Sequence, residues 1–439
     1  MARINNFKGG IFLRGEKSTA KLGIETMPVP RKVVLHLSQH AGLPSSPVVK
    51  KGSYVFSGQL VAEAGGNVSS PLHSSISGTV REITEWTHPV TGLPGESIIV
   101  ESDGRDDRSP DNKNFHEYFR FSPAEIINVV RDAGVVGLGG GAFPTHIKLS
   151  LHKKADIRTL IINGAESEPY LSSDDRLMRE YSKDIIEGAK IMMYVLDAVK
   201  AIIAVEDNKP QAVKELAEII FNEPNIDLAV LKTRYPQGSE KQLVKTILNK
   251  EVPSSGLPFN VGAVVQNVAT AYAVAKAVKE GENLTSRVIT VAGKGIREPK
   301  NIRVRIGTLL ADIAEFCGGA TADLGQVIMG GPMTGVVQPT LKVPVLKCTT
   351  GVLFFSKQET IDRNFSDCFR CGKCSRVCPM GLLPGMLSAH IEKGRVSEAE
   401  KYYPSDCIEC GCCAYVCPAR RPIVEQIRTV KQQILNTKL

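Results

Sequence analysis

The order of hydrophobic and polar positions divides the chain into stretches with different expected structures. Between Met27 and Val100, short apolar runs such as VVLHLSQ and ESIIVES alternate with closely spaced glycine and proline. Runs of this length between turn residues are typical of β-strands. The pattern therefore predicts a small all-β domain, with bounds at 27–113, after an N-terminal extension at 1–26.

From residue 114 to residue 282, apolar runs of strand length alternate with stretches of helical periodicity. SPAEIINVVRDAG has the spacing of a helix capped by Ser122, and RTLIING has the composition of a buried strand. Further strands and helices are expected in DIIEGAKIMMYVLDA, KAIIAVED, KPQAVKELAEIIFNE, IDLAVLKTRY and GSEKQLVKTILNK. We expect AVVQNVATAYAVAKAVKEG to close the region as one helix. This alternation predicts an α/β domain with a largely parallel sheet.

Two smaller units complete the predicted architecture. Residues 283–355 have the order strand, strand, helix and strand with glycine turns, which favours a compact β-grasp-like module. Residues 356–439 hold nine of the 11 cysteines, with a helical insert between two cysteine runs. The expected fold class is α/β plus β, in a chain of several domains.

Charge and hydropathy exclude some classes of function. The formal net charge of +8 is spread along the chain, so we expect no nucleic-acid partner. No window approaches the roughly 18 apolar residues that a membrane span needs, and the N-terminus lacks the pattern of a signal peptide. We expect a cytoplasmic chain, which can still sit on a membrane complex through a protein partner.

The cysteine runs CFRCGKCSRVCP and CIECGCCAYVCP carry the strongest chemical signal. Their C-x2-C-x2-C-x3-C-P spacing is that of bacterial two-cluster ferredoxins, in which the fourth cysteine of each run ligates the other cluster. Structural zinc is the alternative, but both fourth cysteines are present and followed by proline. We predict two [4Fe–4S] clusters, and we expect Cys412 to be an unligated neighbour. The predicted ligands are Cys368, Cys371, Cys374 and Cys417 for one cluster, and Cys407, Cys410, Cys413 and Cys378 for the other.

One-electron clusters that serve a two-electron substrate need an adaptor, and the usual adaptor is a flavin. The candidate site is GVVGLGGGAFPTHIKL, at Gly134–Leu149. Its glycines let the backbone approach a phosphate or a flat ring without interference from a Cβ atom, and Lys148 supplies a cation. Taken alone, the run also fits a plain loop.

Four motifs in order resemble those of the flavin subunit of respiratory NADH dehydrogenase: GLGGGAFPTHIK, NGAESEPYLSSDDRLM, YPQGSEKQL and QNVATA. The sequence is more similar still to the C subunit of the Rnf electron-transport complex, because HLSQHAGLP and a lipoyl-like stretch precede these motifs and two ferredoxin runs follow. The resemblance implies a barrel-sandwich (lipoyl-like) domain, an α/β flavin-binding domain, a β-grasp (soluble-ligand-binding) module and a bacterial two-cluster ferredoxin domain. No lysine lies between Gly52 and Asn112, so the first domain is expected to be a scaffold and not a swinging-arm carrier.

The resemblance also implies roles for individual residues. Glu166 and Glu168 are expected to be catalytic, with Glu168 and Pro169 shaping the nicotinamide side, although a Glu pair alone would fit an exposed turn. Two departures from the family pattern are Ala142, where glycine is expected, and Ala165, where the respiratory protein has aspartate. The residues expected to bind FMN or to line its cavity are Gly137, Gly139, Gly140, Lys148, Asn163, Tyr235, Gly238, Glu240, Asn267 and Thr270.

The expected function is a reversible relay between NAD(H), FMN and the two clusters. The resemblance implies a peripheral subunit of an ion-translocating ferredoxin:NAD+ oxidoreductase, on the cytoplasmic side of the inner membrane. Its partners would be the membrane subunits of the complex and, indirectly, ferredoxin. One alternative is a flavin and iron–sulfur cobalamin reductase of the propanediol-utilisation type, in which the flavin domain should come first. The other is a docking protein with a vestigial flavin site.

Overall fold

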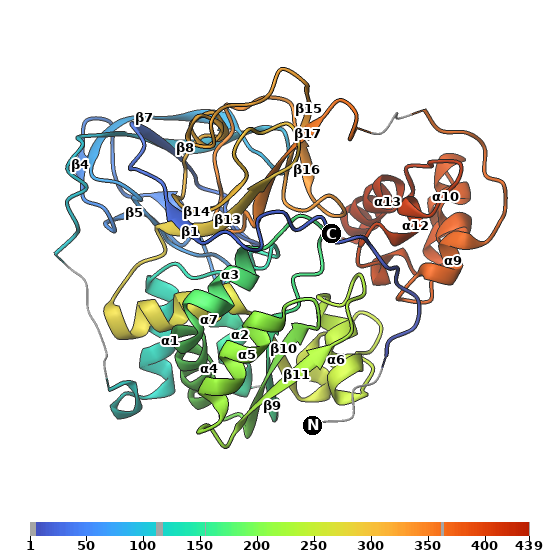
Figure 1. Ribbon diagram of the computed structural model, residues 1–439, viewed down its shortest axis with the longest axis horizontal. Coiled ribbons are helices and arrows are strands. Elements are labelled where there is room, and N and C mark those ends of the chain that lie inside the picture. Colours follow the sequence, from blue (N-terminus) through green and yellow to red (C-terminus); the bar gives the residue numbers. More distant parts are fainter. Residues whose placement is uncertain (1–5, 111–116, 154, 361–363, 439) are drawn as a thin grey trace.

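The computed structural model describes residues 6–110, 117–153, 155–360 and 364–438. Figure 1 shows the α/β part in green and yellow, a β-rich part in blue and orange above it, and the cysteine-rich helices in red to one side. The dark-blue N-terminal segment runs past both the α/β part and the cysteine-rich helices. Its Gly10 amide donates to the Val377 carbonyl at 2.8 Å, and Ile11 forms a bridge with Tyr235.

The first β unit consists of two small sheets around an apolar core, as predicted. Alternation of buried and exposed positions along its strands places valine, leucine and isoleucine side chains inside. One antiparallel sheet contains β2 (Lys32–His36), β8 (Pro94–Ser102), β7 (Gly78–Thr87) and β4 (Tyr54–Val55), in that order. The other contains β3 (Ser46–Pro47), β5 (Leu60–Glu63) and β6 (Leu72–His73).

The α/β domain has a four-stranded sheet in which every pair is parallel, which confirms the expected topology. The strand order is β11 (Ile226–Leu231), β10 (Lys200–Glu206), β9 (Thr159–Gly164) and β12 (Ala263–Asn267). The helices are α1 (Pro123–Asp132), α2 (Thr145–Leu149), α3 (Ser173–Glu180), α4 (Ser182–Leu196), α5 (Pro210–Ile220), α6 (Glu240–Leu248) and α7 (Val268–Ala275). Ser122 caps α1 in a capping box with Glu125, as its sequence predicts.

The expectation of one helix over AVVQNVATAYAVAKAVKEG is wrong at its first five residues. These form β12, whose β-branched Val264 and Val265 are buried and pair with β9. The helix begins only after Asn267, whose side chain accepts a hydrogen bond from the Ala269 amide and caps α7. A π-helical turn, Lys276–Glu280, continues α7.

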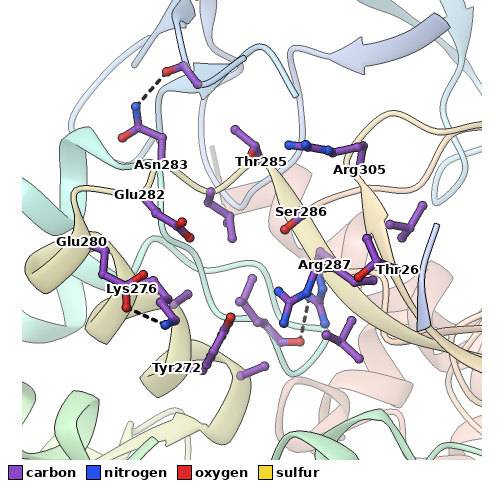
Figure 2. Close-up of a pocket in the computed structure, with 18 of the residues that line it drawn as sticks. Thr26, Tyr272, Lys276, Glu280, Glu282, Asn283, Thr285, Ser286, Arg287 and Arg305 are labelled. Atoms are coloured by element: carbon purple, nitrogen blue, oxygen red, sulfur yellow. Dashed lines mark hydrogen bonds and ion pairs between the residues drawn. The ribbon is translucent and has the colours of Figure 1, made fainter. Parts of the chain in front are cut away.

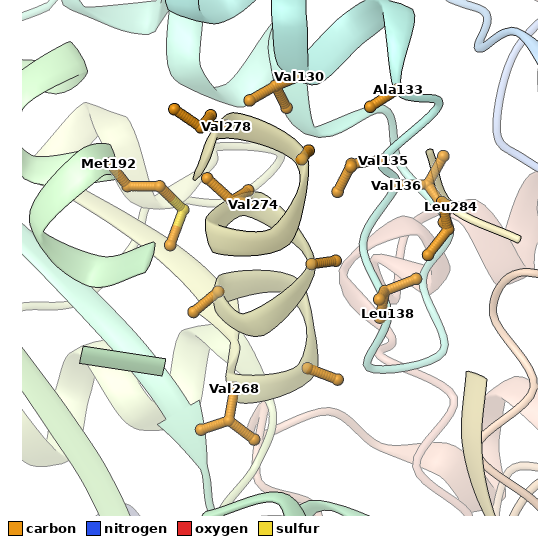
Figure 3. Close-up of a cluster of buried hydrophobic side chains, with 14 of the residues drawn as sticks. Val130, Ala133, Val135, Val136, Leu138, Met192, Val268, Val274, Val278 and Leu284 are labelled. Atoms are coloured by element: carbon orange, nitrogen blue, oxygen red, sulfur yellow. The ribbon is translucent and has the colours of Figure 1, made fainter. Parts of the chain in front are cut away.

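Helix α7 is packed on two sides, which fixes its position. Figure 3 shows Val274 and Val278 near Val130 of α1 and Met192 of α4, while Val135, Val136 and Leu138 lie on the opposite side. The last three residues begin the glycine-rich loop. Burial of each such side chain contributes about 1.5–3 kcal/mol, so this core anchors the loop against the helix.

The β-grasp-like module has a mixed sheet with the order β1-β14-β13-β17-β15-β16. The module's own elements are β13 (Ser286–Ala292), β14 (Lys300–Arg305), α8 (Leu310–Phe316), β15 (Leu324–Met329), β16 (Val336–Gln338) and β17 (Gly351–Ser356). The central pair, β13 and β17, is parallel and is flanked by antiparallel partners, as in β-grasp folds. The N-terminal extension adds the edge strand β1 (Ile24–Thr26), which the sequence pattern did not predict.

The cysteine-rich unit is helical, with the predicted insert between the two runs. Its apolar core includes Leu387, Ile427 and Val430, all of which are fully buried. The helices are α9 (Lys373–Val377), α10 (Pro384–Glu392), α11 (Val396–Glu400), α12 (Cys412–Tyr415) and α13 (Ile423–Lys438). Short 3-10 turns lie at Tyr118–Arg120, Ser150–Lys153, Pro258–Val261 and Pro404–Asp406. Across the ranges that the structure describes, no helix is both long and apolar enough to cross a membrane.

Candidate functional site

A cavity of about 350 Å³ opens at the carboxyl edge of the parallel sheet. Asn163 is the next-to-last residue of β9, Asn267 is the last residue of β12, and the two are paired in register. Strand β10 lies on the other side of β9, so the strand order changes direction between β9 and β12. Ligands of open α/β sheets bind at such a point, and the volume lies in the usual range for small-molecule sites.

Most of the predicted flavin-site residues line this cavity, and four do not. Those in its wall are Gly139, Gly140, Asn163, Glu166, Glu168, Tyr235, Gly238 and Asn267. The other four are Gly137, Lys148, Glu240 and Thr270, which lie behind the wall. Their predicted contacts with FMN stay predictions.

The four residues behind the wall hold the glycine loop and its neighbours in place. The Gly137 amide donates to the Phe143 carbonyl at 2.8 Å, which closes the loop. The Thr270 hydroxyl accepts from the Leu138 amide at 2.9 Å and ties the loop to α7. Lys148 forms an ion pair with Glu240, so this cation has a partner within the protein.

Two asparagines fix the edge of the sheet beneath the cavity. Asn163 donates to the Gly238 carbonyl at 2.8 Å and accepts from the Ala165 amide at 3.2 Å. Asn267 donates to Asp174 at 2.6 Å while its oxygen caps α7. Since amide side chains can donate and accept at once, they join the loops after β9 and β12 to the helices behind them.

Ala142 adopts a left-handed backbone conformation with φ of +50°. Such a conformation favours glycine and costs a residue with a Cβ atom on the order of 1–2 kcal/mol. The Ala142 carbonyl accepts a hydrogen bond from the Ala41 amide at 3.0 Å, so the barrel-sandwich domain braces the loop at this residue.

Glu166 has a structural role that its sequence context did not predict. Its carboxylate accepts from the Asp174 amide at 2.7 Å and from the Asp175 amide at 3.2 Å, at the first turn of α3. A carboxylate at a helix N-terminus satisfies free amide groups and interacts favourably with the helix dipole. Glu166 also has a positive φ of 42°, so its backbone is held in an unusual conformation.

Asp174 is buried beside Glu166 and faces the cavity. Burial, together with the nearby charge of Glu166, raises the pKa of Asp174 from 3.8 to about 7. The hydrogen bond from Asn267 and the positive charges of Arg287 and Lys209 oppose this shift. The carboxyl group of Asp174 therefore holds a proton through much of the acidic range.

The raised pKa of Asp174 predicts a stability that falls as pH rises. Between about pH 4 and pH 7 the folded protein holds a proton that the unfolded chain has lost, so this contribution is complete below about pH 4 and disappears above about pH 7. Asp174→Asn should raise the melting temperature at pH 8 relative to the wild type and leave it almost unchanged at pH 4. The exposed Asp227→Asn is the control and should keep the wild-type pH profile. If the melting temperatures of wild type and Asp174→Asn changed with pH in parallel, the raised pKa of Asp174 would be contradicted.

Glu168 is held by the β-grasp-like module, in the wall opposite the glycine loop. Its carboxylate accepts from the Met333 amide at 3.0 Å and from the Thr334 hydroxyl at 2.6 Å. Burial raises the pKa of Glu168 despite these bonds. A Cβ atom on Gly331 would lie 2.4 Å from the Glu168 carboxyl carbon, so this close approach requires glycine. The loop from Gly330 to Thr334 therefore positions Glu168.

Lys17, in the N-terminal segment, fastens the loop that carries both glutamates. Its ammonium group donates to the carbonyls of Glu166 and Glu168 at 3.0 and 3.2 Å and also to that of Leu171. Only 14% of its side chain is exposed, and burial lowers the pKa of Lys17. No sequence motif singled out this residue, because its partners lie about 150 positions away.

Lys17→Met should loosen this loop, because the methionine has a similar shape but no donor. We expect a lower melting temperature and a free energy of unfolding that is lower by about 2 kcal/mol. We also expect the affinity for FMN to fall about tenfold. Flavin titration of the variant measures the second effect. Lys21→Met removes an exposed lysine of the same segment and is the matched control. Equal FMN affinity in the two variants would show that Lys17 does not hold the site.

The cysteine-rich unit contains a small cavity whose wall includes five cysteines, Cys378, Cys407, Cys410, Cys412 and Cys413. Four of them are the ligands predicted for one cluster, one of which comes from the first run, and the fifth, Cys412, is the neighbour expected to be unligated. In the described ranges, no three His, Cys, Asp or Glu side chains converge on a single ion position. A [4Fe–4S] cluster instead needs thiolates spaced around a larger group, and the arrangement of these four fits that need.

The two cysteine runs share one local geometry. The second residue after the first cysteine has φ of 53° at Arg370 and 54° at Glu409, and each donates its amide to that cysteine's sulfur at 3.4 Å. The glycines two positions further on, Gly372 and Gly411, also have positive φ. This repeated loop turns successive cysteines toward a common centre, which supports a cluster at each run.

The second cysteine run borders the cavity of the α/β domain. Ile408 and Cys410 form part of that cavity's wall. The Tyr235 hydroxyl donates to the Cys410 carbonyl at 2.7 Å, and Met333 packs in the same apolar cluster as Tyr235 and Cys412. The wall of one cavity thus includes both the glycine loop and a predicted cluster ligand.

Several residues of the cavity wall escaped prediction from the sequence. Asp174 lies inside a quoted motif without an assigned role, and the glycines of the GGPMTG run signalled a turn only. Residues 348–350 also line the cavity, and the sequence assigned no role to them. These residues reach the site through folding of distant segments, which leaves no local pattern.

Family models match four stretches of the chain. They are an RnfC barrel sandwich hybrid domain at 5–105, a Nuo51 FMN-binding domain at 130–276, an SLBB domain at 288–337 and a 4Fe-4S dicluster domain at 360–418. The first match begins within the N-terminal extension, and the others lie inside the predicted units or within a few residues of them.

Similar proteins span almost the whole chain. The C subunit of the proton-translocating ferredoxin:NAD(+) oxidoreductase complex of Clostridium ljungdahlii is 43% identical over 98% of this chain and 94% of its own length. The C subunit of the Na(+)-translocating ferredoxin:NAD(+) oxidoreductase complex of Acetobacterium woodii is 40% identical over 98% and 97%. A solved NAD+-reducing [NiFe]-hydrogenase in the H2-reduced state has a TM-score of 0.51 at 19% identity, over 75% of this chain and 65% of that chain, and shows the fold alone.

Proposed function

Since this chain belongs to the family of RnfC proteins, the C subunits of ion-translocating oxidoreductase complexes, we propose that it carries electrons between NAD(H) and a pair of iron–sulfur clusters. One observation carries the proposal. A single cavity joins the glycine loop of an FMN-binding domain to Cys410, a predicted ligand of the second cluster.

The residues present fit both kinds of cofactor. When bound, FMN supplies the exchange between two-electron and one-electron chemistry, and the clusters supply one-electron transfer. Gly139 and Gly140 offer a wall without side chains, while Asn163 and Asn267 hold the sheet edge beneath it. We propose that Gly139 and Gly140 face the flavin, with the residues behind them keeping the loop rigid.

The two predicted catalytic glutamates have different surroundings. The Glu166 carboxylate already caps α3, which favours a positioning role for this residue. Glu168 lies between two cavities, because it also lines a neighbouring one of about 540 Å³. We propose that Glu168 contacts the nicotinamide side of the substrate.

The neighbouring cavity suits the rest of a dinucleotide. Its wall includes the basic side chains of Arg14, Lys232 and Arg234 beside the acidic Glu206 and Asp207. It shares Glu168 and Tyr235 with the flavin-domain cavity. Basic side chains favour the pyrophosphate of NAD(H) through charge-assisted hydrogen bonds. We propose that the dinucleotide extends from the flavin side into this second cavity.

We propose that the protein is peripherally associated with the cytoplasmic face of the inner membrane. The relatives from Clostridium ljungdahlii and Acetobacterium woodii are named as subunits of complexes that translocate protons and sodium ions, respectively. We propose that this chain likewise docks on the membrane subunits of such a complex and exchanges electrons with ferredoxin only through them.

An anaerobic titration with NADH tests the proposal on protein reconstituted with FMN, iron and sulfide. Flavin absorbance and iron–sulfur absorbance are followed together, and NADPH is the comparison substrate. We expect NADH to bleach both chromophores. Protein that binds no flavin, or that does not respond to NADH, would instead support a docking protein with a vestigial site.

A further inference from the structure

A separate cavity of about 380 Å³ lies where three units meet. The barrel-sandwich domain contributes Ser57, Gly58 and Arg108, α7 and the turn after it contribute Tyr272 and Lys276, and β13 and β14 contribute a further part of the wall. Figure 2 shows Lys276, Glu280 and Glu282 along one side of this space and Arg305 across from them. None of the residues assigned to FMN, NAD(H) or the clusters lines it.

The charged residues of this wall are mostly basic. Five arginine or lysine side chains line it, against two glutamates. Lys276 pairs with Glu280 and Arg108 with Glu282, while Arg305 pairs with Asp106 behind the wall. Within the described parts of the chain, Arg287 and Arg303 have no carboxylate at ion-pair distance. Arg287 and Arg303 therefore bring two positive charges to the cavity wall without a carboxylate partner.

Of these two arginines, Arg303 is the better placed to bind an anion in the cavity. Its guanidinium lies 5.2 Å from the ring of Tyr181 and 5.5 Å from that of Tyr272, so two aromatic faces hold it in a fixed orientation. Arg305 lies two residues further along β14, hence on the same face and about 7 Å away. Both side chains line the cavity, and two guanidinium groups can engage separate oxygens of one anion.

We propose that this cavity binds a small phosphate-bearing molecule, with Arg303 as its principal ligand. The volume falls within the range of small-molecule sites. A phosphate offers at least three acceptor oxygens, and it matches several converging cations better than a single carboxylate does.

The site would also touch the back of the flavin loop. Leu138 lines this cavity, while its neighbour Gly139 lines the flavin-domain cavity. Arg287 donates to the Leu138 carbonyl at 3.0 Å, as Figure 2 shows, so a ligand here contacts the element that carries the flavin wall. Such a ligand changes the flavin site only if it binds one conformation of the glycine loop more tightly than another.

Calorimetric titration with inorganic pyrophosphate tests the proposal, on FMN- and cluster-loaded protein at low salt. Loading with FMN keeps the probe out of the flavin site. Pyrophosphate can also enter the cavity of Arg14, Lys232 and Arg234, so the event assigned to the new site is the one that Arg303→Gln weakens. We expect that event to be weakened at least about tenfold in Arg303→Gln and to be weakened by added salt. Arg297→Gln removes an exposed arginine of the same module outside the cavity and should bind as the wild type does.

Three results would overturn the proposal: no binding to the wild type, equal binding to wild type and Arg303→Gln, or tighter binding of citrate than of pyrophosphate. If Arg303→Gln does not fold, as judged by its melting temperature, Arg108→Gln replaces it. Arg108 is 72% exposed, so this change should fold, and pyrophosphate affinity should fall several-fold. Unchanged affinity in that variant would equally count against the site.

The test is independent of the proposed electron-transfer function. Protein carrying Gly139→Val, in which the flavin wall is altered, should still bind pyrophosphate. Loss of pyrophosphate binding in this variant would place the probe in the flavin-domain cavity and overturn the assignment.

Discussion

Cys413→Ser is expected to remove one of the two iron–sulfur clusters and roughly half of the iron bound per chain. Cys413 lines the small cavity together with Cys378, Cys407 and Cys410, and it packs in the core of the cysteine-rich unit. Serine has no thiolate to offer as a ligand. Iron analysis and low-temperature electron paramagnetic resonance of the reduced protein measure the loss.

The adjacent Cys412→Ser is the matched control for this prediction. Cys412 is also buried and also lines the small cavity, but it packs in the apolar cluster of Tyr235 and Met333, whereas Cys413 packs in the core of the cysteine-rich unit. We expect this variant to keep both clusters. Iron loss from Cys412→Ser with retention in Cys413→Ser would show that the register of the second run differs from the one assigned here.

Gly139→Val is expected to lower FMN affinity at least about a hundredfold, equivalent to about 2.8 kcal/mol. A Cβ atom at this position would lie 3.1 Å from the Asn267 Cβ atom, and the valine methyl groups would fill part of the cavity. Overpacking of this kind costs about 1–3 kcal/mol even without loss of ligand contacts. Flavin content after purification and titration of the apoprotein with FMN measure the effect.

Gly141→Val tests the same glycine run without reaching the cavity. A Cβ atom at Gly141 has no neighbour within 4 Å, and Gly141 is not part of the cavity wall. We expect nearly normal flavin binding in this variant. Equal loss of flavin in both variants would mean that the whole loop, and not the wall at Gly139, determines binding.

The elements predicted correctly are those whose signal is local. Ser122 and Glu125 form the capping box that their spacing indicates, and the RTLIING run forms the buried strand β9. The cysteine spacing selected four of the five cysteines that line one cavity, and their roles as cluster ligands stay predictions. In these cases the residues that decide the structure lie within a few positions of one another.

The misses have a different physical origin. Helical periodicity continued from α7 back into β12, and only pairing with β9 makes Val264 and Val265 a strand. The ion pair of Lys148 with Glu240, which is 92 positions away, was not predicted, and the role of Lys148 toward FMN stays a prediction. Lys17 and the Gly330–Thr334 loop belong to the site only because the N-terminal segment and the β-grasp-like module fold against the α/β domain. Partners so far apart cannot be identified from local sequence.

Rapid anaerobic mixing of the fully loaded protein with NADH tests the proposed relay most directly. We predict that flavin absorbance falls first and that iron–sulfur absorbance follows without an added mediator, because one cavity joins the glycine loop to Cys410. Gly139→Val protein, which lacks flavin, should then show no cluster reduction by NADH. Cluster reduction at the wild-type rate in that variant, or reduced flavin beside clusters that stay oxidised although they have the higher potential, would contradict the relay.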